Sequence, residues 1–249
     1  MPLRSTDAVI IGGHDLAEAD RIIVFYTQAV GKVRAVAEGA RRIRSRFGGT
    51  LQLFTQGRLV YFERPNRTLH KVNEFAVTDS HQALREDLDR IALGSTLVEA
   101  VALGVADEQP SPALYGLLAE GLALVEAAGR PSVILHGFTL HLLRLLGYLP
   151  ELGVCVGCRA GLPPRAPVAL SAGRGGLLCP ACRSLASDAR VLSPEALGFL
   201  RGAGGAPLRL MGRVGLSPGV EREVGGVLRS FLQHVLGRPL KSADFLGRL

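Results

Sequence analysis

The chain has 249 residues, a formal net charge of +7 and a sequence pI of about 9.7, and 47% of its residues are hydrophobic and 20% charged. This balance is typical of a folded globular protein and excludes a disordered one. The N-terminus lacks the apolar core of a secretory signal, and the longest apolar stretch, 133–149, is interrupted by His136, His141 and Arg144, which argues against a membrane span. We therefore expect a cytoplasmic protein whose thiols stay reduced.

The first eighty residues have the pattern of a small β-barrel. Five short runs are rich in Val, Ile, Phe and Thr, and glycine, asparagine, proline or charged clusters separate them. The runs cover residues 7–13, 21–28, 32–39, 51–63 and 69–78. Such runs are typical of strands, and no helical period lies between them. Five strands in so short a segment favour an OB-fold over residues 1–79, with an SH3-like barrel as the alternative on strand count alone.

A run of arginines lies between the third and fourth predicted strands. Arg41, Arg42, Arg44 and Arg46 fall within six residues, with glycines on both sides. Their mutual repulsion is costly unless an anion neutralises it, and guanidinium binds phosphate through paired hydrogen bonds. The run favours contact with nucleic acid; a protein partner or a solvated loop is the alternative. Other basic residues extend this predicted surface: Lys32, Arg34, Arg58, Arg64, Arg67 and Lys71.

The charge along the chain is segregated. Residues 30–72 carry ten basic side chains against two acidic ones, a balance of +8, whereas residues 81–150 carry four against eight, a balance of −4. This pattern indicates a polyanionic partner approached from one side, and nucleic acid is the commonest such partner. Four aromatic residues near the arginines could stack on unpaired bases, although we expect at least two of them to belong to the barrel core. They are Phe47, Phe54, Tyr61 and Phe62.

After residue 78 the hydrophobic period becomes helical. Apolar residues at spacings of three and four from Leu84 to Val105 predict an amphipathic helix. Three Ser-Pro pairs predict helix starts, with serine as the N-cap and proline at the first helical position; they stand at 111–112, 193–194 and 217–218. Residues 131–148 are apolar on most faces and predict a central helix. We expect residues 80–150 and 186–249 to form one helical domain.

All four cysteines lie in a segment rich in glycine and proline, residues 151–185, which we expect to be an insert in the helical domain. Their pattern is C-x2-C-x20-C-x2-C, formed by Cys155, Cys158, Cys179 and Cys182. Two such knuckles are typical of a zinc site, and four protein ligands leave no open position, so the ion would be structural. The alternatives are a redox pair, which would need a CxxC motif at the start of a helix, and coincidence.

Arginines stand beside both knuckles. Arg159 and Arg183 each follow the second cysteine, where a glycine is usual, and Arg174 lies in the loop between the knuckles. They either contact DNA or offset the net charge of −2 that four thiolates leave around one Zn²⁺. No catalytic constellation is recognisable: His136 and His141 would point about 140° apart on a helix, and the glycine motifs that bind phosphates are missing. We expect no enzyme and no small-molecule substrate.

Two long stretches resemble one known family. "EADRIIVFYTQAVGKVRAVAEGARRIRSRFGGTLQLFT", residues 18–55, resembles the N-terminal barrel of the bacterial RecO family of DNA repair and recombination mediators. "LHGFTLHLLRLLGYLPELGVCVGC", residues 135–158, is similar to that family's central helix and first zinc knuckle. The order of barrel, helices, four-cysteine insert and helices resembles the family over essentially the whole chain.

The resemblance implies an OB-fold that binds single- and double-stranded DNA and anneals complementary strands. It also implies RecR and single-strand-binding protein as partners, so that RecA loads onto covered DNA. It places Lys32, Arg34 and the four arginines in the region expected to meet DNA, and the four cysteines at ligand positions of zinc-containing members. Some members lack these cysteines.

The expectation is therefore an α+β protein in the cytoplasm, associated with the nucleoid. It has an OB barrel, a helical domain and an inserted module holding one structural Zn²⁺, and it acts as a non-enzymatic DNA-binding mediator. An RNA-binding barrel and an unrecognised nucleic-acid-modifying enzyme are the alternatives.

Overall fold

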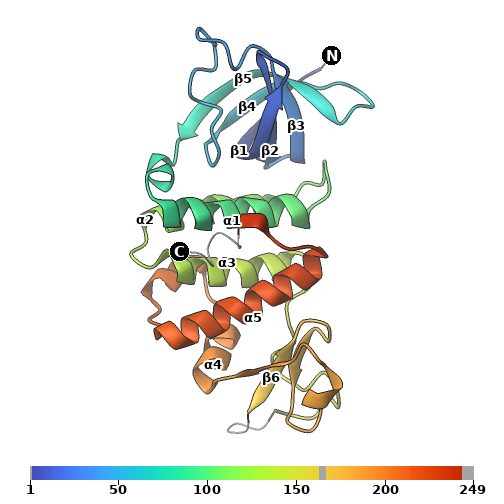
Figure 1. Cartoon of the computed structure of the whole chain (residues 1–249). Coiled ribbons are helices and arrows are strands. Elements are labelled where there is room, and N and C mark those ends of the chain that lie inside the picture. The colour runs from blue at the N-terminus through green and yellow to red at the C-terminus, as the bar shows by residue number, and fades with distance from the viewer. Residues whose placement is uncertain (1, 163–166, 243–249) are drawn as a thin grey trace. The chain divides into compact units, whose positions relative to one another are not determined.

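The computed structural model describes residues 2–162 and 167–242 (Figure 1). It divides into two compact units, Met1–Glu126 and Ala127–Leu249. The first unit therefore extends past the predicted barrel and includes the first two helices, because the aromatic ring of Phe54 packs against the backbone of Gly94 in the first of them. The predicted boundary at residue 79 coincides with the end of the last barrel strand.

The barrel of the first unit has five strands: β1 (Leu3–Leu16), β2 (Asp20–Thr27), β3 (Gly31–Ala37), β4 (Gln56–Phe62) and β5 (Leu69–Asp79). They close in the order β1-β2-β3-β5-β4, with β3 and β5 parallel and the other pairs antiparallel. This is the strand number and closure of an OB-fold, which confirms the predicted fold class. Residues 51–55, predicted as the start of a strand, form turns instead, and β4 begins at Gln56.

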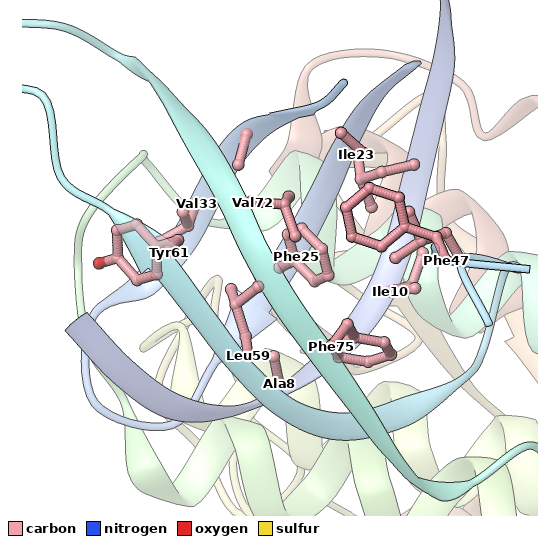
Figure 2. Close-up of a cluster of buried hydrophobic side chains, with 13 residues drawn as sticks. Ala8, Ile10, Ile23, Phe25, Val33, Phe47, Leu59, Tyr61, Val72 and Phe75 are labelled. Atoms are coloured by element: carbon pink, nitrogen blue, oxygen red, sulfur yellow. The ribbon is translucent and has the colours of Figure 1, made fainter. Parts of the chain in front are cut away.

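The barrel core consists of side chains that alternate along the strands and point inward (Figure 2). Within this core the rings of Phe25 and Phe75 contact each other at a tilt of 50°, with their centroids 5.5 Å apart. Phe47 belongs to the same cluster although it comes from the long loop between β3 and β4. Figure 2 shows its ring beside Ile10 and Ile23. This loop is therefore fixed to the barrel by a buried aromatic ring.

Helices follow the barrel in the first unit. The predicted helix from Leu84 is divided into a 3-10 turn, η1 (Gln82–Arg85), and α1 (Leu88–Gly104), because the side chain of Asp87 caps α1 by accepting from the backbone N–H of Arg90. α2 (Pro112–Ala127) begins as predicted, with Ser111 Oγ accepting from the N–H of Leu114 at 3.3 Å.

The second unit contains α3 (Pro131–Leu145), α4 (Pro194–Ala203), the 3-10 helix η3 (Leu208–Arg213) and α5 (Pro218–Leu236). α3 packs against α4, α5 and η3, which confirms its predicted central position. Ser193 and Ser217 cap α4 and α5 through the N–H groups three residues ahead. Gly237 ends α5 in the left-handed conformation, with φ 68°, the usual role of glycine at this position.

The four-cysteine segment of the second unit carries a small sheet of three strands. They are β6 (Val168–Ser171), β7 (Gly176–Leu178) and β8 (Arg190–Leu192), in the order β7-β6-β8, with a 3-10 turn, η2 (Arg183–Leu185), between β7 and β8. β8 lies beyond residue 185, where the predicted insert ends. Among the helices that the structure describes, none has the length and apolar character needed to cross a bilayer.

Candidate functional site

Lys32, one of the predicted DNA-binding residues, is buried inside the first unit and does not face solvent. It is 8% exposed, and its ammonium donates to the carbonyl oxygens of Ala102 at 3.0 Å and Val105 at 2.8 Å. It also pairs with Asp107 at 3.1 Å. The carbonyls belong to the last turn of α1 and the residue after it, which have no partners within the helix. Lys32 therefore stabilises the fold through these contacts, and its predicted contact with DNA stays a prediction.

The segment between α1 and α2 lies directly on this end of β3. The N–H of Glu108 donates to the carbonyl of Lys32 at 3.0 Å, and the buried ring of His70 lies 3.2 Å from the Glu108 carboxylate. A Cβ atom at Gly31 would lie 2.2 Å from the carbonyl oxygen of Gln109, so only glycine permits this approach. The start of β3 is thus covered, and the open basic surface lies further along the barrel.

The four arginines of the loop between β3 and β4 divide into two kinds. Arg41 pairs with Asp15 at 3.3 Å and donates to the carbonyls of Ala17 and Glu18. Arg46 donates to the carbonyl of Val72 at 3.2 Å, and its guanidinium lies 4.8 Å from the centroid of the Phe47 ring. These two arginines hold the loop against the barrel.

Arg42 and Arg44 are exposed, and neither has a side-chain hydrogen bond or ion pair with any residue that the structure describes. In the turn between β4 and β5, Arg67 is exposed and Arg64 is partly exposed, and their side chains likewise have no hydrogen bond or ion pair with any described residue. An uncompensated guanidinium on a protein surface is available for an external anion. These four arginines are the strongest candidates for phosphate contacts.

An open pocket of about 500 Å³ lies beside this loop. Its lining combines three cations with two carboxylates, one aromatic ring and one amide; the residues are Arg42, Arg46, Lys71, Asp20, Glu38, Phe62 and Asn73, with Gly39. Phe62 is partly exposed, whereas Phe47, Phe54 and Tyr61 are buried in the core. Of the four predicted stacking residues, Phe62 alone is therefore accessible to a base.

The other three predicted DNA-binding residues are paired; Arg34 and Arg58 are exposed, and Lys71 is partly exposed. Arg34 lies 3.6 Å from Asp107, Arg58 lies 3.2 Å from Asp7, and Lys71 lies 2.6 Å from Glu38. Exposed pairs of this kind are weak, so phosphate can compete with the carboxylate for the cation. These residues extend the basic surface, but each should contribute less to the free energy of DNA binding than an arginine without a partner.

The two histidines of α3 have different surroundings within the second unit. Burial lowers the pKa of His136 to about 4, with the nearby Glu221 opposing the shift, and the ring packs edge-on against Phe199. His141 donates to the carbonyl of Ala206 at 2.9 Å. They share no ligand.

A cluster that the sequence did not indicate joins Asp79, His81 and Glu126, whose ligand atoms lie within 4.8 Å of one another. Its groups satisfy each other: Glu126 accepts from His81 Nδ1 at 2.6 Å and from the N–H of Ala83 at 3.1 Å, and Asp79 accepts from the N–H of His81 at 2.9 Å. The cluster ties η1 to α2. The residues are too far apart in the sequence to form a local motif.

The four cysteines converge as the spacing predicted, and none forms a disulfide. Their sulfur atoms all lie within 4.8 Å of one another, and Cys158 Sγ lies 3.9 Å from Cys179 Sγ. A tetrahedral ion with metal–sulfur bonds of about 2.3 Å requires sulfur separations of about 3.8 Å, so the arrangement fits such an ion.

Backbone groups also favour a thiolate at the cluster. Burial opposes ionisation of Cys155, but N–H donors from Cys179, Cys158 and Gly157 outweigh it and lower its pKa to about 6. Arg159 takes the left-handed conformation with φ 62°, the conformation for which glycine is usual at this position. The knuckle formed by Cys155 and Cys158 therefore has the usual left-handed turn after its second cysteine, but with backbone strain at Arg159.

The first unit thus contains an OB barrel, with a basic loop anchored to it, and the first two helices; the second is a helical unit with a four-cysteine module. Residues 1–81 match the family description "Recombination protein O N terminal", and residues 85–244 match "Recombination protein O C terminal". The chain belongs to the RecO family of DNA repair proteins.

Curated relatives named DNA repair protein RecO support this assignment over nearly full length. The protein of Roseiflexus sp. is 35% identical over 241 residues, covering 97% of this chain and 84% of the relative. That of Symbiobacterium thermophilum is 34% identical over 251 residues, covering 100% and 98%. That of Syntrophus aciditrophicus is 30% identical over 246 residues, covering 98% and 95%.

Proposed function

We propose that this chain is a non-enzymatic mediator that binds single- and double-stranded DNA through its barrel and anneals complementary strands. With RecR as partner, it helps RecA to load onto strands covered by single-strand-binding protein. Membership of the RecO family supports this role. The observation that carries it is a set of arginines on two loops of the barrel whose side chains have no partner among the described residues. Arg42 and Arg44 on one loop and Arg67 on the other are exposed, and Arg64 beside Arg67 is partly exposed.

The chemistry of annealing follows from charge. Two strands repel each other through their phosphates, and a protein that neutralises phosphates on both lowers this barrier while releasing bound counterions. Guanidinium suits the task because it stays protonated and forms two parallel hydrogen bonds with one phosphate. The partly exposed ring of Phe62 offers a stacking surface for one unpaired base beside these cations.

For the cysteine module we propose one structural Zn²⁺, held by Cys155, Cys158, Cys179 and Cys182. The sulfur separations fit a tetrahedral ion, and four protein ligands close its coordination sphere. Such an ion stabilises the fold of the module and does not activate water. Arg159, beside the second ligand, offsets part of the negative charge of the thiolates.

The salt dependence of DNA binding tests the role of the loop. Replacing both Arg42 and Arg44 by Ala should lower the slope of log affinity against log salt on single-stranded DNA by about 1.4, because each lost phosphate contact contributes about 0.7. The control variant replaces Arg209 and Arg213, exposed residues of η3, and removes the same charge from the second unit. An unchanged slope in the first variant and a lowered one in the second would overturn the assignment.

Two further assays separate this proposal from the alternatives. In competition between DNA and RNA strands of equal length and sequence, an RNA-binding barrel would prefer the strand with 2′-hydroxyl groups. Incubation of end-labelled DNA with divalent metal should leave every covalent bond intact, because a mediator only rearranges strands. Cleaved or modified product would show an enzyme.

A further inference from the structure

Ile43 is a large apolar side chain placed entirely in solvent. Its relative accessibility is 105%, whereas the next most exposed large hydrophobic residue that the structure describes, Leu88, reaches 63%. Leaving an Ile side chain in water forgoes the favourable free energy of burying it. Single exposed hydrophobic residues are common on surfaces, but this one stands between Arg42 and Arg44, which are unpaired.

The backbone under Ile43 is held before any ligand arrives. The N–H of Arg42 donates to the carbonyl of Gly39 at 3.1 Å, and the N–H of Ser45 donates to the carbonyl of Arg42 at 3.0 Å. These turns lie between the Arg41 anchor at Asp15 and the buried ring of Phe47. A β-branched side chain has few χ1 rotamers to lose. Ile43 is therefore a stiff projection on a fixed loop.

The neighbours of Ile43 determine what it fits. An apolar pocket on a protein would have to carry anionic groups on both sides to accept the guanidinium groups of Arg42 and Arg44. A nucleic-acid strand offers this arrangement at every step, because phosphates run beside a stack of apolar base faces. Proteins that unstack bases insert Phe, Leu, Ile, Met or Pro between base steps.

We infer that Ile43 is a wedge that inserts between two adjacent bases of the bound strand while Arg42 and Arg44 bind its phosphates. This inference rests on the proposed DNA binding and adds a separate role to it. Unstacking one base step costs free energy, and the phosphate contacts offset this cost. A strand bound in this way is opened at one base step, which frees base edges for pairing with a complementary strand.

Fluorescence of 2-aminopurine tests the wedge, because stacking quenches this base. The probe is placed at the centre of a purine-rich single strand of about eight nucleotides, within the range of one OB-fold site. The unmodified full chain should raise the fluorescence on saturation. Ile43→Ala should lose at least half of this rise, with a salt slope equal to that of the unmodified chain. Ile43→Met should keep the rise, since Met also fills a base step.

Leu88→Ala is the matched control, since it shortens an exposed aliphatic side chain of the same unit away from the loop. It should leave both fluorescence and slope unchanged. A full fluorescence rise with Ile43→Ala, or no rise when the unmodified chain is saturated with DNA, overturns the wedge and leaves the proposed function intact. Failure of the unmodified chain to bind the strand overturns both. Loss of fluorescence with Leu88→Ala as well would assign the signal to a general change in the fold.

Discussion

Lys32→Met is the sharpest test of how this barrel uses its basic residues. Methionine keeps the length and apolar stem of lysine but removes the ammonium. In the folded protein this leaves the carbonyls of Ala102 and Val105 and the carboxylate of Asp107 without the donor that they share. The change therefore separates a stabilising role from a DNA-binding role at one residue.

The size of the effect follows from these contacts. A hydrogen bond from a charged donor contributes about 1.5 to 3 kcal/mol, and breaking a buried ion pair costs about 3 to 5 kcal/mol. The Asp107 side chain is 31% exposed and lies 3.6 Å from Arg34. Water and Arg34 therefore still stabilise its carboxylate in the variant, which reduces the loss of stability. We expect the free energy of unfolding to fall by about 3 kcal/mol.

Urea unfolding followed by circular dichroism measures this loss of stability. Asp107→Asn and the double variant, Lys32→Met with Asp107→Asn, complete a double-mutant cycle. The two changes should be non-additive by about 1 kcal/mol or more, because the residues are in contact. The salt slope of DNA binding should not change. If Lys32→Met instead costs less than about 1 kcal/mol and lowers the slope by about 0.7, the buried arrangement is wrong and Lys32 binds phosphate.

Three further predictions concern the core and the metal module. Below about pH 6.5 the unfolded chain binds a proton at His136, whereas the folded chain does so only near pH 4. The free energy of unfolding should therefore fall by about 1.4 kcal/mol for each pH unit that the pH is lowered within this window. His136→Phe should flatten the dependence of the unfolding free energy on pH, measured from pH 7 to 5. Cys155→Ser should abolish zinc retention, measured as metal content per chain, and lower the melting temperature while the salt slope of DNA binding stays unchanged; loss of DNA binding by a folded variant would show that the module contacts DNA. The hydroxyl of Tyr26 is buried without a hydrogen-bond partner among the described residues, and burial raises its pKa to about 12. Tyr26→Phe should therefore stabilise the chain by about 1 kcal/mol in thermal unfolding, and a lower melting temperature would contradict this.

The features predicted correctly from the sequence depend on neighbours along the chain. The serine caps at residues 111, 193 and 217 need only three residues of local sequence, and the two CxxC knuckles need four each. The barrel strands follow from the alternation of apolar residues, which closing a small sheet requires. Such signals survive in the folded chain because tertiary packing agrees with them.

The arginine loop depends on contacts that could not be predicted from neighbouring residues in the sequence. Its four arginines look alike in the sequence, yet Arg41 forms an ion pair with Asp15 and Arg46 donates a hydrogen bond to the carbonyl of Val72. Each partner lies 26 residues away in the chain. Lys32 likewise meets carbonyls that lie 70 and 73 residues further along the chain. No motif records such pairs, because they depend on how α1 and the loop pack on the barrel. The division between structural and available cations is therefore a property of the tertiary structure.

The burial of Phe47 has a thermodynamic consequence for DNA binding. Arginine-rich segments that are disordered when free must fold on nucleic acid, and this gives association a large negative heat-capacity change. Here the loop is already ordered by a ring inside the barrel and by two anchored guanidinium groups. The enthalpy of association with a short strand should accordingly vary little with temperature, and the entropy gained should come mainly from released counterions.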